Sequence, residues 1–223
     1  MTREPAPDPK ARWERVWREK RPDEVSWHQR RPTHSLELIA ASGAGPGTPL
    51  VDVGGGASPL VDTLLEAGWQ DLTVLDISGA ALAHARARLG PAATRIRWVE
   101  ADVTAWAPEA GRYGLWHDRA VLHFLTTPET RARYVERLRT ALRPGGWAVI
   151  ATFAPDGPER CSGLPVRRYD AELLLETLGD GFELVEERRE THRTPAGAEQ
   201  RFAWFLLRHK GSGFSGTTRD ATR

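Results

Sequence analysis

The feature that most constrains this chain is a glycine-rich segment, VDVGGGAS at residues 51–58, which begins as an apolar strand. Valines stand on both sides of Asp52, as expected for a buried parallel strand. Gly54 and Gly56 allow the backbone to turn sharply and to come close to a ligand. A helix that starts near Ser58 would direct free backbone N–H groups toward the same ligand. The segment therefore predicts a strand, a loop and a helix that together bind a nucleotide-type molecule.

Two further strands are each predicted to end in an acid. LTVLDIS, residues 72–78, places Asp76 22 residues after Gly54 (76 − 54 = 22), the spacing at which a Rossmann-like unit holds ribose hydroxyls with a carboxylate. IRWVEADV, residues 96–103, has the composition of a strand and ends at Asp102. Because ligands of open α/β sheets bind at the carboxyl ends of the strands, these acids are expected near one bound molecule.

Strand and helix patterns alternate along most of the chain, which implies right-handed crossovers and a parallel sheet. The predicted helices span residues 11–20, 33–42, 58–67, 79–89, 128–142 and 169–179. The predicted strands span residues 50–53, 72–76, 96–100, 113–118, 147–153, 182–190 and 200–209.

The glycine-rich loop resembles the first motif of the class I S-adenosylmethionine-dependent methyltransferases. That motif has the form acid-x-Gly-x-Gly, which Asp52, Gly54 and Gly56 match. Ser58 stands where a third glycine is often found. The dinucleotide fingerprint G-x-G-x-x-G fits less well, because Pro59 takes the position of its last glycine. The loop therefore favours a methyl donor over a dinucleotide.

The resemblance covers roughly residues 35–208 and includes LRPGGWAVIATF, in which RPGG at 143–146 is expected to separate a helix from a strand. It implies an α/β, Rossmann-like class I methyltransferase fold, with a mostly parallel seven-stranded sheet, an antiparallel last strand and helices on both faces. A turn at 194–197 would supply the final hairpin. The expected organisation is a disordered arm at 1–10, an N-terminal helical lid at 11–34, a methyltransferase domain at 35–210 and a disordered tail at 211–223.

The resemblance implies S-adenosyl-L-methionine as cofactor and S-adenosyl-L-homocysteine as product. Asp52 would face the methionine ammonium, and Asp76 would accept hydrogen bonds from the ribose hydroxyls. Ile77 would cover the adenine ring, Asp102 would accept from the adenine amino group, and Val103 would supply a backbone donor. Each acid also has a structural interpretation, as the end of a strand or as a turn former. The complete expected cofactor set is Asp52, Gly54, Gly55, Gly56, Ser58, Asp76, Ile77, Asp102, Val103 and Asp118.

The catalytic candidates lie in WHDRAVLHFLT, residues 116–126, at the tip of the fourth predicted strand. Asp118 stands where the family commonly has a polar residue, and His117 and His123 are the titratable groups near it. His123 fits a packed histidine equally well. Arg119 either pairs with a buried acid such as Asp118 or recognises a substrate carboxylate. A base is optional, because in-line approach to the sulfonium methyl group does most of the work.

Two segments are expected to close the acceptor side of the site. Trp27 and His28, which follow the first helix, would form part of a lid. The loop at 153–169 is long enough to be functional, and its Cys161 and Arg168 suggest a wall of the acceptor pocket. One cysteine without a second nearby does not indicate a metal site, and none is predicted.

Composition agrees with one enzyme domain. The 223 residues are enough for one substantial core, and 31 basic against 30 acidic residues give a net charge of +1. This balance gives no electrostatic reason to expect a nucleic-acid partner. The single cysteine fits a reducing compartment, and no apolar run is long enough for a membrane span or a signal peptide. A cytoplasmic protein without membrane contact is expected.

Four function classes follow from these residues. The first is methyl transfer to a small-molecule acceptor, since no large insertion suggests a macromolecular one. A protein lysine methyltransferase is the alternative, and it would need an open groove instead of an enclosed pocket. A nicotinamide-dependent reductase and a non-catalytic cofactor binder are the further alternatives. The identity of the acceptor and the oligomeric state stay open at this stage.

Overall fold

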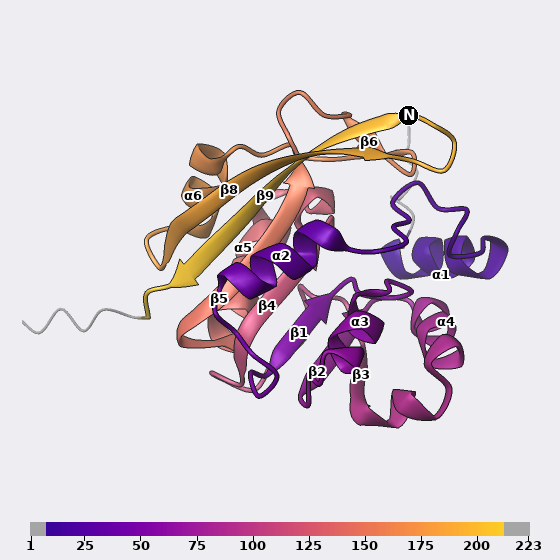
Figure 1. Ribbon diagram of the computed structural model, residues 1–223. Coiled ribbons are helices and arrows are strands. Elements are labelled where there is room, and N and C mark those ends of the chain that lie inside the picture. The colour runs from indigo at the N-terminus through magenta and orange to yellow at the C-terminus, as the bar shows by residue number, and fades with distance from the viewer. Residues whose placement is uncertain (1–7, 212–223) are drawn as a thin grey trace, which may run out of the picture.

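A seven-stranded sheet forms the centre of residues 8–211, the part of the chain that the computed structural model describes (Figure 1). Its strands are β1 (Leu50–Val53), β2 (Leu72–Asp76), β3 (Ile96–Glu100), β4 (Tyr113–Arg119), β5 (Leu142–Phe153), β8 (Phe182–Arg193) and β9 (Glu199–His209). They lie in the order β3-β2-β1-β4-β5-β9-β8, and β9 runs antiparallel to both of its neighbours while the other pairs are parallel. The predicted sheet, mostly parallel with an antiparallel last strand, is confirmed.

Helices cover both faces of the sheet, as predicted (Figure 1). They are α1 (Pro9–Glu19), α2 (Thr33–Ala41), α3 (Leu60–Glu66), α4 (Gly79–Leu89), α5 (Pro128–Ala141) and α6 (Ala171–Leu178), with short 3-10 turns at Gly90–Arg95 and Leu122–Phe124. Leu38 of α2, Leu60 of α3 and Leu82 of α4 share one apolar cluster. Leu138 of α5 and Leu174 of α6 belong to a second cluster on the opposite face.

The central strand β1 is buried over its whole length, because it lies between two other strands and between two helical layers. Val51 and Val53 belong to the cluster on the α5 side, and Leu50 to the cluster on the α2 side. Side chains alternate along a strand, so Asp52 points to the α2 side as well. A carboxylate in such a place needs hydrogen-bond partners.

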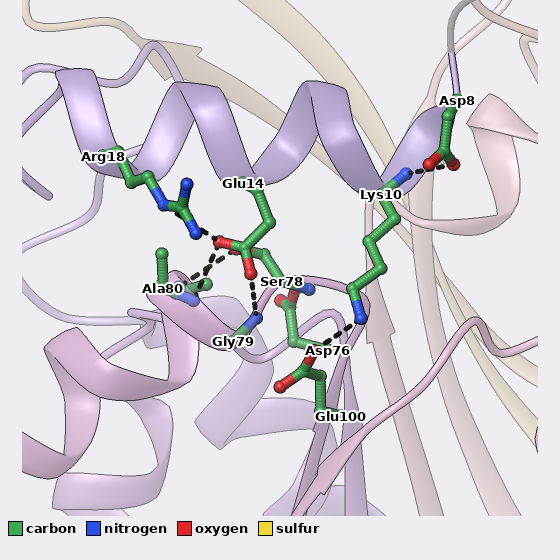
Figure 2. A network of polar contacts seen from close by, with 10 residues as sticks. Asp8, Lys10, Glu14, Arg18, Asp76, Ser78, Gly79, Ala80 and Glu100 are labelled. Carbon is green, nitrogen blue, oxygen red and sulfur yellow. Dashed lines mark hydrogen bonds and ion pairs between the residues drawn. The ribbon is translucent and has the colours of Figure 1, made fainter.

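The first helix docks on the start of α4 (Figure 2). The Glu14 carboxylate accepts hydrogen bonds from the Ser78 hydroxyl and from the backbone N–H groups of Gly79 and Ala80, each at 3.1 Å. Although partial burial opposes ionisation, the donors from Ala80 and Ser78 lower the pKa of Glu14. These N–H groups are the free donors of a helix N-terminus, so a distant segment supplies the acid that caps them.

Several boundaries differ from the sequence prediction, and two of them have a local cause. The helix α1 begins at Pro9, inside the predicted arm, because the Asp8 side chain accepts from the N–H of Lys10 and proline suits a first helical turn. The predicted break at 143–146 lies inside β5, where it forms a bulge between two register positions of β4. The predictions for residues 1–7 and 212–223 fall outside the described residues.

The predicted loop at 153–169 contains a small ribbon, β6 (Arg160–Cys161) and β7 (Leu164–Pro165), which sequence patterns did not indicate. The final hairpin between β8 and β9 turns at 194–197, as predicted. Within residues 8–211, none of the helices has the length and apolar character needed to cross a bilayer.

The buried hydroxyl of Tyr134, on α5, forms a hydrogen bond to β4 that a substitution can test. Tyr134 Oη donates to Asp118 Oδ2 at 2.6 Å and accepts from Trp116 Nε1 at 3.1 Å. At about pH 8 the carboxyl is ionised, since burial raises the pKa of Asp118 only to about 6. Tyr134→Phe should therefore lower the free energy of unfolding in urea by about 1.5–3 kcal/mol.

The matched control is Tyr113→Phe, which removes a bond of 3.2 Å between two neutral hydroxyl groups, Tyr113 Oη and Thr73 Oγ1. It should cost about 1 kcal/mol, less than the loss of a bond to a charged group. Equal losses in the two variants would contradict the assignment of a charged acceptor to Tyr134.

Candidate cofactor and acceptor site

The glycine loop leaves no room for side chains. Gly54 has a φ of +68°, in the left-handed region that favours glycine. A Cβ at Gly55 would overlap the Asp52 carboxylate, and a Cβ at Gly56 would stand 2.6 Å from Asp76 Oδ2. The backbone of the loop therefore passes directly against the carboxylates at the ends of β1 and β2.

Asp52 is held by His117, its direct partner in the register of β4. His117 Nδ1 lies 2.7 Å from Asp52 Oδ1, and His117 Nε2 lies 2.9 Å from Ser35 Oγ of α2. The side chains of all three residues are buried. Asp52 Oδ2 has no hydrogen-bond partner among residues 8–211, and an unpaired buried carboxylate oxygen is costly. The site thus offers this oxygen to a donor on a ligand.

Asp76 lies at the end of β2, beside the same loop. Its Oδ1 accepts from the N–H of Ser78 at 2.8 Å. Burial raises the pKa of Asp76 to about 7; the N–H of Ser78 opposes this shift, and the like charges of Asp52 and Glu14 add to it. A ligand that donates hydrogen bonds to Asp76 would favour its ionised form.

The adenine-side candidates lie at the ends of β2 and β3. Ile77 is half-buried and Val103 is buried. Asp102 Oδ1 accepts from the N–H and the hydroxyl of Thr104, both at 2.8 Å, so this acid also forms the turn after β3. The Ser58 hydroxyl accepts from the N–H two positions later, at the start of α3. Their contacts with adenine and cofactor stay predictions.

A cavity lies beside the glycine loop, between the end of β4 and the segment that joins α1 to α2. The predicted site residues that line it are Asp52, Gly54, Gly55, Ser58, Trp27, His28, His117 and Arg119. The predicted residues outside this lining are Gly56, Asp76, Ile77, Asp102, Val103, Asp118, His123, Cys161 and Arg168.

Asp118 points to the other face of the sheet. Its Oδ2 accepts from Tyr134 Oη and from the N–H of Leu122, and its Oδ1 accepts from the N–H of Val121 at 2.8 Å. The carboxylate thus closes the turn after β4 and fixes α5. A role of Asp118 in catalysis or cofactor binding stays a prediction, and these contacts supply a structural reason for the acid.

His123 is packed between aromatic rings, with its ring centre 4.4 Å from that of Phe124 and 4.8 Å from that of Phe153. Neither of its nitrogens has a hydrogen-bond partner among the described residues. Burial lowers the pKa of His123 to about 3, and the nearby charge of Arg119 acts in the same direction. An imidazole with so low a pKa accepts a proton poorly near neutral pH, which favours the packed-histidine interpretation over a base.

Arg119 does not pair with Asp118, which the sequence offered as one example of a buried acid for it. Its Nη1 donates to the carbonyl oxygen of Trp27 at 2.9 Å, and its Cζ lies 5.1 Å from the centre of the Phe202 ring. Burial lowers the pKa of Arg119, while the charge of Glu190 raises it. The side chain joins the end of β4 to the N-terminal segment.

The loop after β5 contributes less than predicted to this cavity. Cys161 is buried on β6, and burial raises the pKa of its thiol to about 11, so the sulfur is protonated. Arg168 donates to the carbonyl oxygen of Gly157 and to Glu159 Oε1, both at 3.2 Å, and therefore braces its own loop. Acceptor-side roles for both residues stay predictions.

Sequence patterns missed two residues that hold the site together. Ser35 lies in an apolar helix, 82 positions before His117, and Glu14 lies 64 positions before Ser78. No local motif marks either residue, because each acts only through a partner that folding brings close.

Known proteins share both sequence and fold with this chain. Residues 50–146 match the family model described as a methyltransferase domain. Trans-aconitate 2-methyltransferase of Paracidovorax citrulli is 34% identical over 153 residues, which make up 67% of this chain and 55% of that protein. The chain therefore spans about half the length of this curated relative.

Two solved structures have the same fold, and each was determined with S-adenosylhomocysteine. The 1,6-didemethyltoxoflavin-N1-methyltransferase of Burkholderia thailandensis is 23% identical, with a TM-score of 0.70 over 93% of both chains. The N-methyltransferase NodS of Bradyrhizobium japonicum is 17% identical, with a TM-score of 0.66 over 88% of this chain and 97% of that one. With these matches, residues 50–146 form a methyltransferase domain, and the chain has the fold of the class I S-adenosylmethionine-dependent methyltransferases.

Proposed function

We propose that this protein transfers the methyl group of S-adenosyl-L-methionine to a small-molecule acceptor. The observation that carries the proposal is the cavity beside the glycine loop, which the N-terminal segment encloses against the end of β4. When bound, the cofactor supplies a methyl group on a sulfonium; the S–CH3 bond breaks as the bond from the acceptor atom to that carbon forms, and the electron pair stays on the neutral thioether sulfur.

The residues around the loop fit this cofactor. The unpaired Asp52 Oδ2 is an acceptor for the methionine ammonium, and Asp76 is an acceptor for the ribose hydroxyls. Because Gly55 and Gly56 have no side chains, no Cβ atom occupies the space beside the two carboxylates. Pro59 takes the position of the last glycine of the dinucleotide fingerprint, which argues against a nicotinamide-dependent reductase.

The enclosed cavity supports a small acceptor. Trp27 and His28 line it beside the glycine loop, and a protein acceptor would need an open groove to bring a side chain there. The curated relative is named for trans-aconitate and one structural neighbour for a toxoflavin precursor, both small molecules. A protein lysine residue is therefore a weaker proposal.

His117 is the proposed base for acceptors that must lose a proton. It lines the cavity, and Asp52 orients its ring through Nδ1. Its Nε2 is occupied by the hydroxyl of Ser35, which also lines the cavity, so a proton from the acceptor would pass to Ser35 Oγ as the Ser35 proton passes to Nε2. An acceptor that is already an anion needs no base. His123 and Asp118 are less suited, because their surroundings hold them away from this cavity.

The segment at 11–34 is the proposed lid. Its helix is bound to α4 through Glu14 (Figure 2). Its later part contacts Arg119 through the carbonyl oxygen of Trp27. Opening would break hydrogen bonds at two places and would expose the cavity to solvent. Closure would exclude water from the methyl group during transfer.

The first test is ligand binding by calorimetry with S-adenosylmethionine, S-adenosylhomocysteine and NADH. We expect saturable binding of both sulfur compounds and none of NADH. Labelled methyl transfer in a cell extract then locates the acceptor, with label expected in the small-molecule fraction. Label only in protein would contradict the proposed acceptor class, and binding of NADH alone would refute methyl transfer.

Gly55→Ala tests the loop. The added methyl group would overlap the Asp52 carboxylate, so the loop must move away from the cofactor site. We expect calorimetry to show at least a tenfold weaker affinity for S-adenosylhomocysteine, which corresponds to about 1.4 kcal/mol. Gly47→Ala is the control, because a Cβ at Gly47 meets nothing within 4 Å. Equal affinities of the two variants would show that the loop does not bind the cofactor.

The pH dependence of binding tests Asp76. Its folded pKa of about 7 lies above the ordinary value of 3.8, so the unliganded fold gains stability from the protonated form and loses it as pH rises toward 7. Ribose hydroxyls donate to the ionised form, so the affinity for S-adenosylhomocysteine should rise between about pH 6 and pH 8.

In Asp76→Asn this pH dependence should disappear, and the affinity at about pH 8 should fall about tenfold or more. Glu14→Gln is the matched control, because Glu14 is the neighbouring acid on α1 and raises the pKa of Asp76. It should keep the dependence, with a midpoint at lower pH. An unchanged pH profile in Asp76→Asn would show that another group titrates.

A further inference from the structure

Arg119 carries two donors that the fold does not use. Its Nη1 donates to the carbonyl oxygen of Trp27, but Nε and Nη2 are shielded from solvent and have no hydrogen-bond partner among residues 8–211. A shielded cation with open donors is costly in a folded protein. Contacts within residues 8–211 therefore leave two N–H donors of a shielded arginine without acceptors.

The two open donors form one edge of the guanidinium. The N–H bonds of Nε and Nη2 run parallel, and such an edge matches the two oxygens of a carboxylate. Arg88 shows the same pairing within this chain, since its Nε and Nη2 donate to Asp62 Oδ1 and Oδ2 at 2.8 and 2.7 Å. The unpaired edge of Arg119 presents the same two donors as the paired edge of Arg88.

Neighbouring groups do not fill this edge. No carboxylate of the described residues lies within 4.0 Å of the guanidinium of Arg119. Glu190 is near, but its Oε1 accepts from Gln29 Nε2 at 2.9 Å and its Oε2 from Trp204 Nε1 at 2.7 Å. The Phe202 ring offers a cation–π contact, worth about 0.5–2 kcal/mol, which offsets only part of the cost of the unpaired charge.

Arg119 lies beside the proposed site of the methyl donor. Arg119 lines the cavity together with Gly54 and His117, one strand away from the glycine loop. The next residue, Ala120, has a φ of 72°, which is unfavourable for a residue with a Cβ. This turn ends β4 directly after Arg119 and fixes where the side chain starts.

From these contacts we infer that the Nε–Nη2 edge of Arg119 binds a carboxylate of the methyl acceptor. The inference rests on the proposed methyl transfer and narrows its acceptor to a small carboxylic acid. A guanidinium withdraws electron density from the oxygens that it binds, so this carboxylate is an anchor. The methyl group goes to another nucleophilic atom of the same molecule.

Arg119→Met separates binding from structure, because methionine fills a similar volume without a charge. We expect its Tm to equal or exceed that of the wild type, since the variant removes an unpaired cation. The matched control is Arg112→Met, whose guanidinium is paired with both oxygens of Asp71 at the far end of β4. The control should lower Tm by about 2–4 °C. A clearly lower Tm for Arg119→Met would assign Arg119 a structural role and overturn the inference.

Cofactor binding distinguishes the two possible sources of the carboxylate. S-adenosylhomocysteine has a carboxylate, whereas methylthioadenosine has none. We expect Arg119→Met to bind both compounds as the wild type does. If it weakens S-adenosylhomocysteine more than tenfold and leaves methylthioadenosine unchanged, the edge binds the donor, and the acceptor assignment is wrong.

Acetate is the probe for the edge itself, with acetamide as its neutral counterpart. In 15N-labelled protein saturated with S-adenosylhomocysteine, the Nε–Hε signal of Arg119, assigned by its loss in Arg119→Lys, should shift saturably with acetate and not with acetamide. No shift with acetate, or equal shifts with both, would overturn the inference. In the labelled-extract assay, Arg119→Met should lower transfer about 100-fold, and Arg119→Lys should recover little of it.

Failure of the proposed function gives a different pattern. If the wild type binds no sulfur ligand, methyl transfer is refuted, and acetate titration of the free protein still reports on the edge of Arg119. If the wild type transfers methyl groups and Arg119→Met transfers them at the same rate, only the acceptor inference is refuted.

Discussion

The pair formed by Asp52 and His117 is the interaction on which the rest of the site depends. Asp52 lies in the middle of a strand that is buried on both faces, where an unpaired carboxylate would be too costly to keep. His117, on the adjacent strand, offsets this cost through its contact with Asp52 Oδ1, and Ser35 of α2 contacts the other nitrogen of the ring. One carboxylate oxygen is left over, directly under Gly55. One oxygen of the acid is thus satisfied by the fold, and the other is the acceptor proposed for a ligand.

Because side chains alternate along β4, three consecutive polar residues point to two different faces of the sheet. His117 and Arg119 point to the cavity, whereas Asp118 points to α5 and accepts from Tyr134. A strand period of two residues makes this separation unavoidable. The three residues are adjacent in the sequence, but the sheet places them in two different environments. Asp118 contacts α5, whereas His117 and Arg119 line the cavity.

The N-terminal segment links the cofactor side of the site to the acceptor side. Glu14 binds the N-terminal N–H groups of α4, next to Asp76, and the carbonyl oxygen of Trp27 binds Arg119. Glu14 accepts from N–H groups that the start of a helix leaves without a partner. Arg119 donates through one of its several N–H groups. Movement of this segment would therefore change the surroundings of a carboxylate and of a guanidinium together.

The sequence by itself determined the order of strands and helices and the acids at the strand ends, because these follow from local periodicity and from glycine. The antiparallel last strand was implied by the resemblance to the methyltransferase family. The sequence also indicated Arg119, and it left open whether the residue pairs with an acid or meets a substrate. Only the tertiary structure showed that Asp118 faces α5, that His123 is packed between Phe124 and Phe153, and that Ser35 and Glu14 complete the site. It also revealed the bulge in β5 and the ribbon at Cys161. The physical reason is distance along the chain: a hydrogen bond between residues 64 or 82 positions apart is set by how helices pack on the sheet, which no local pattern records.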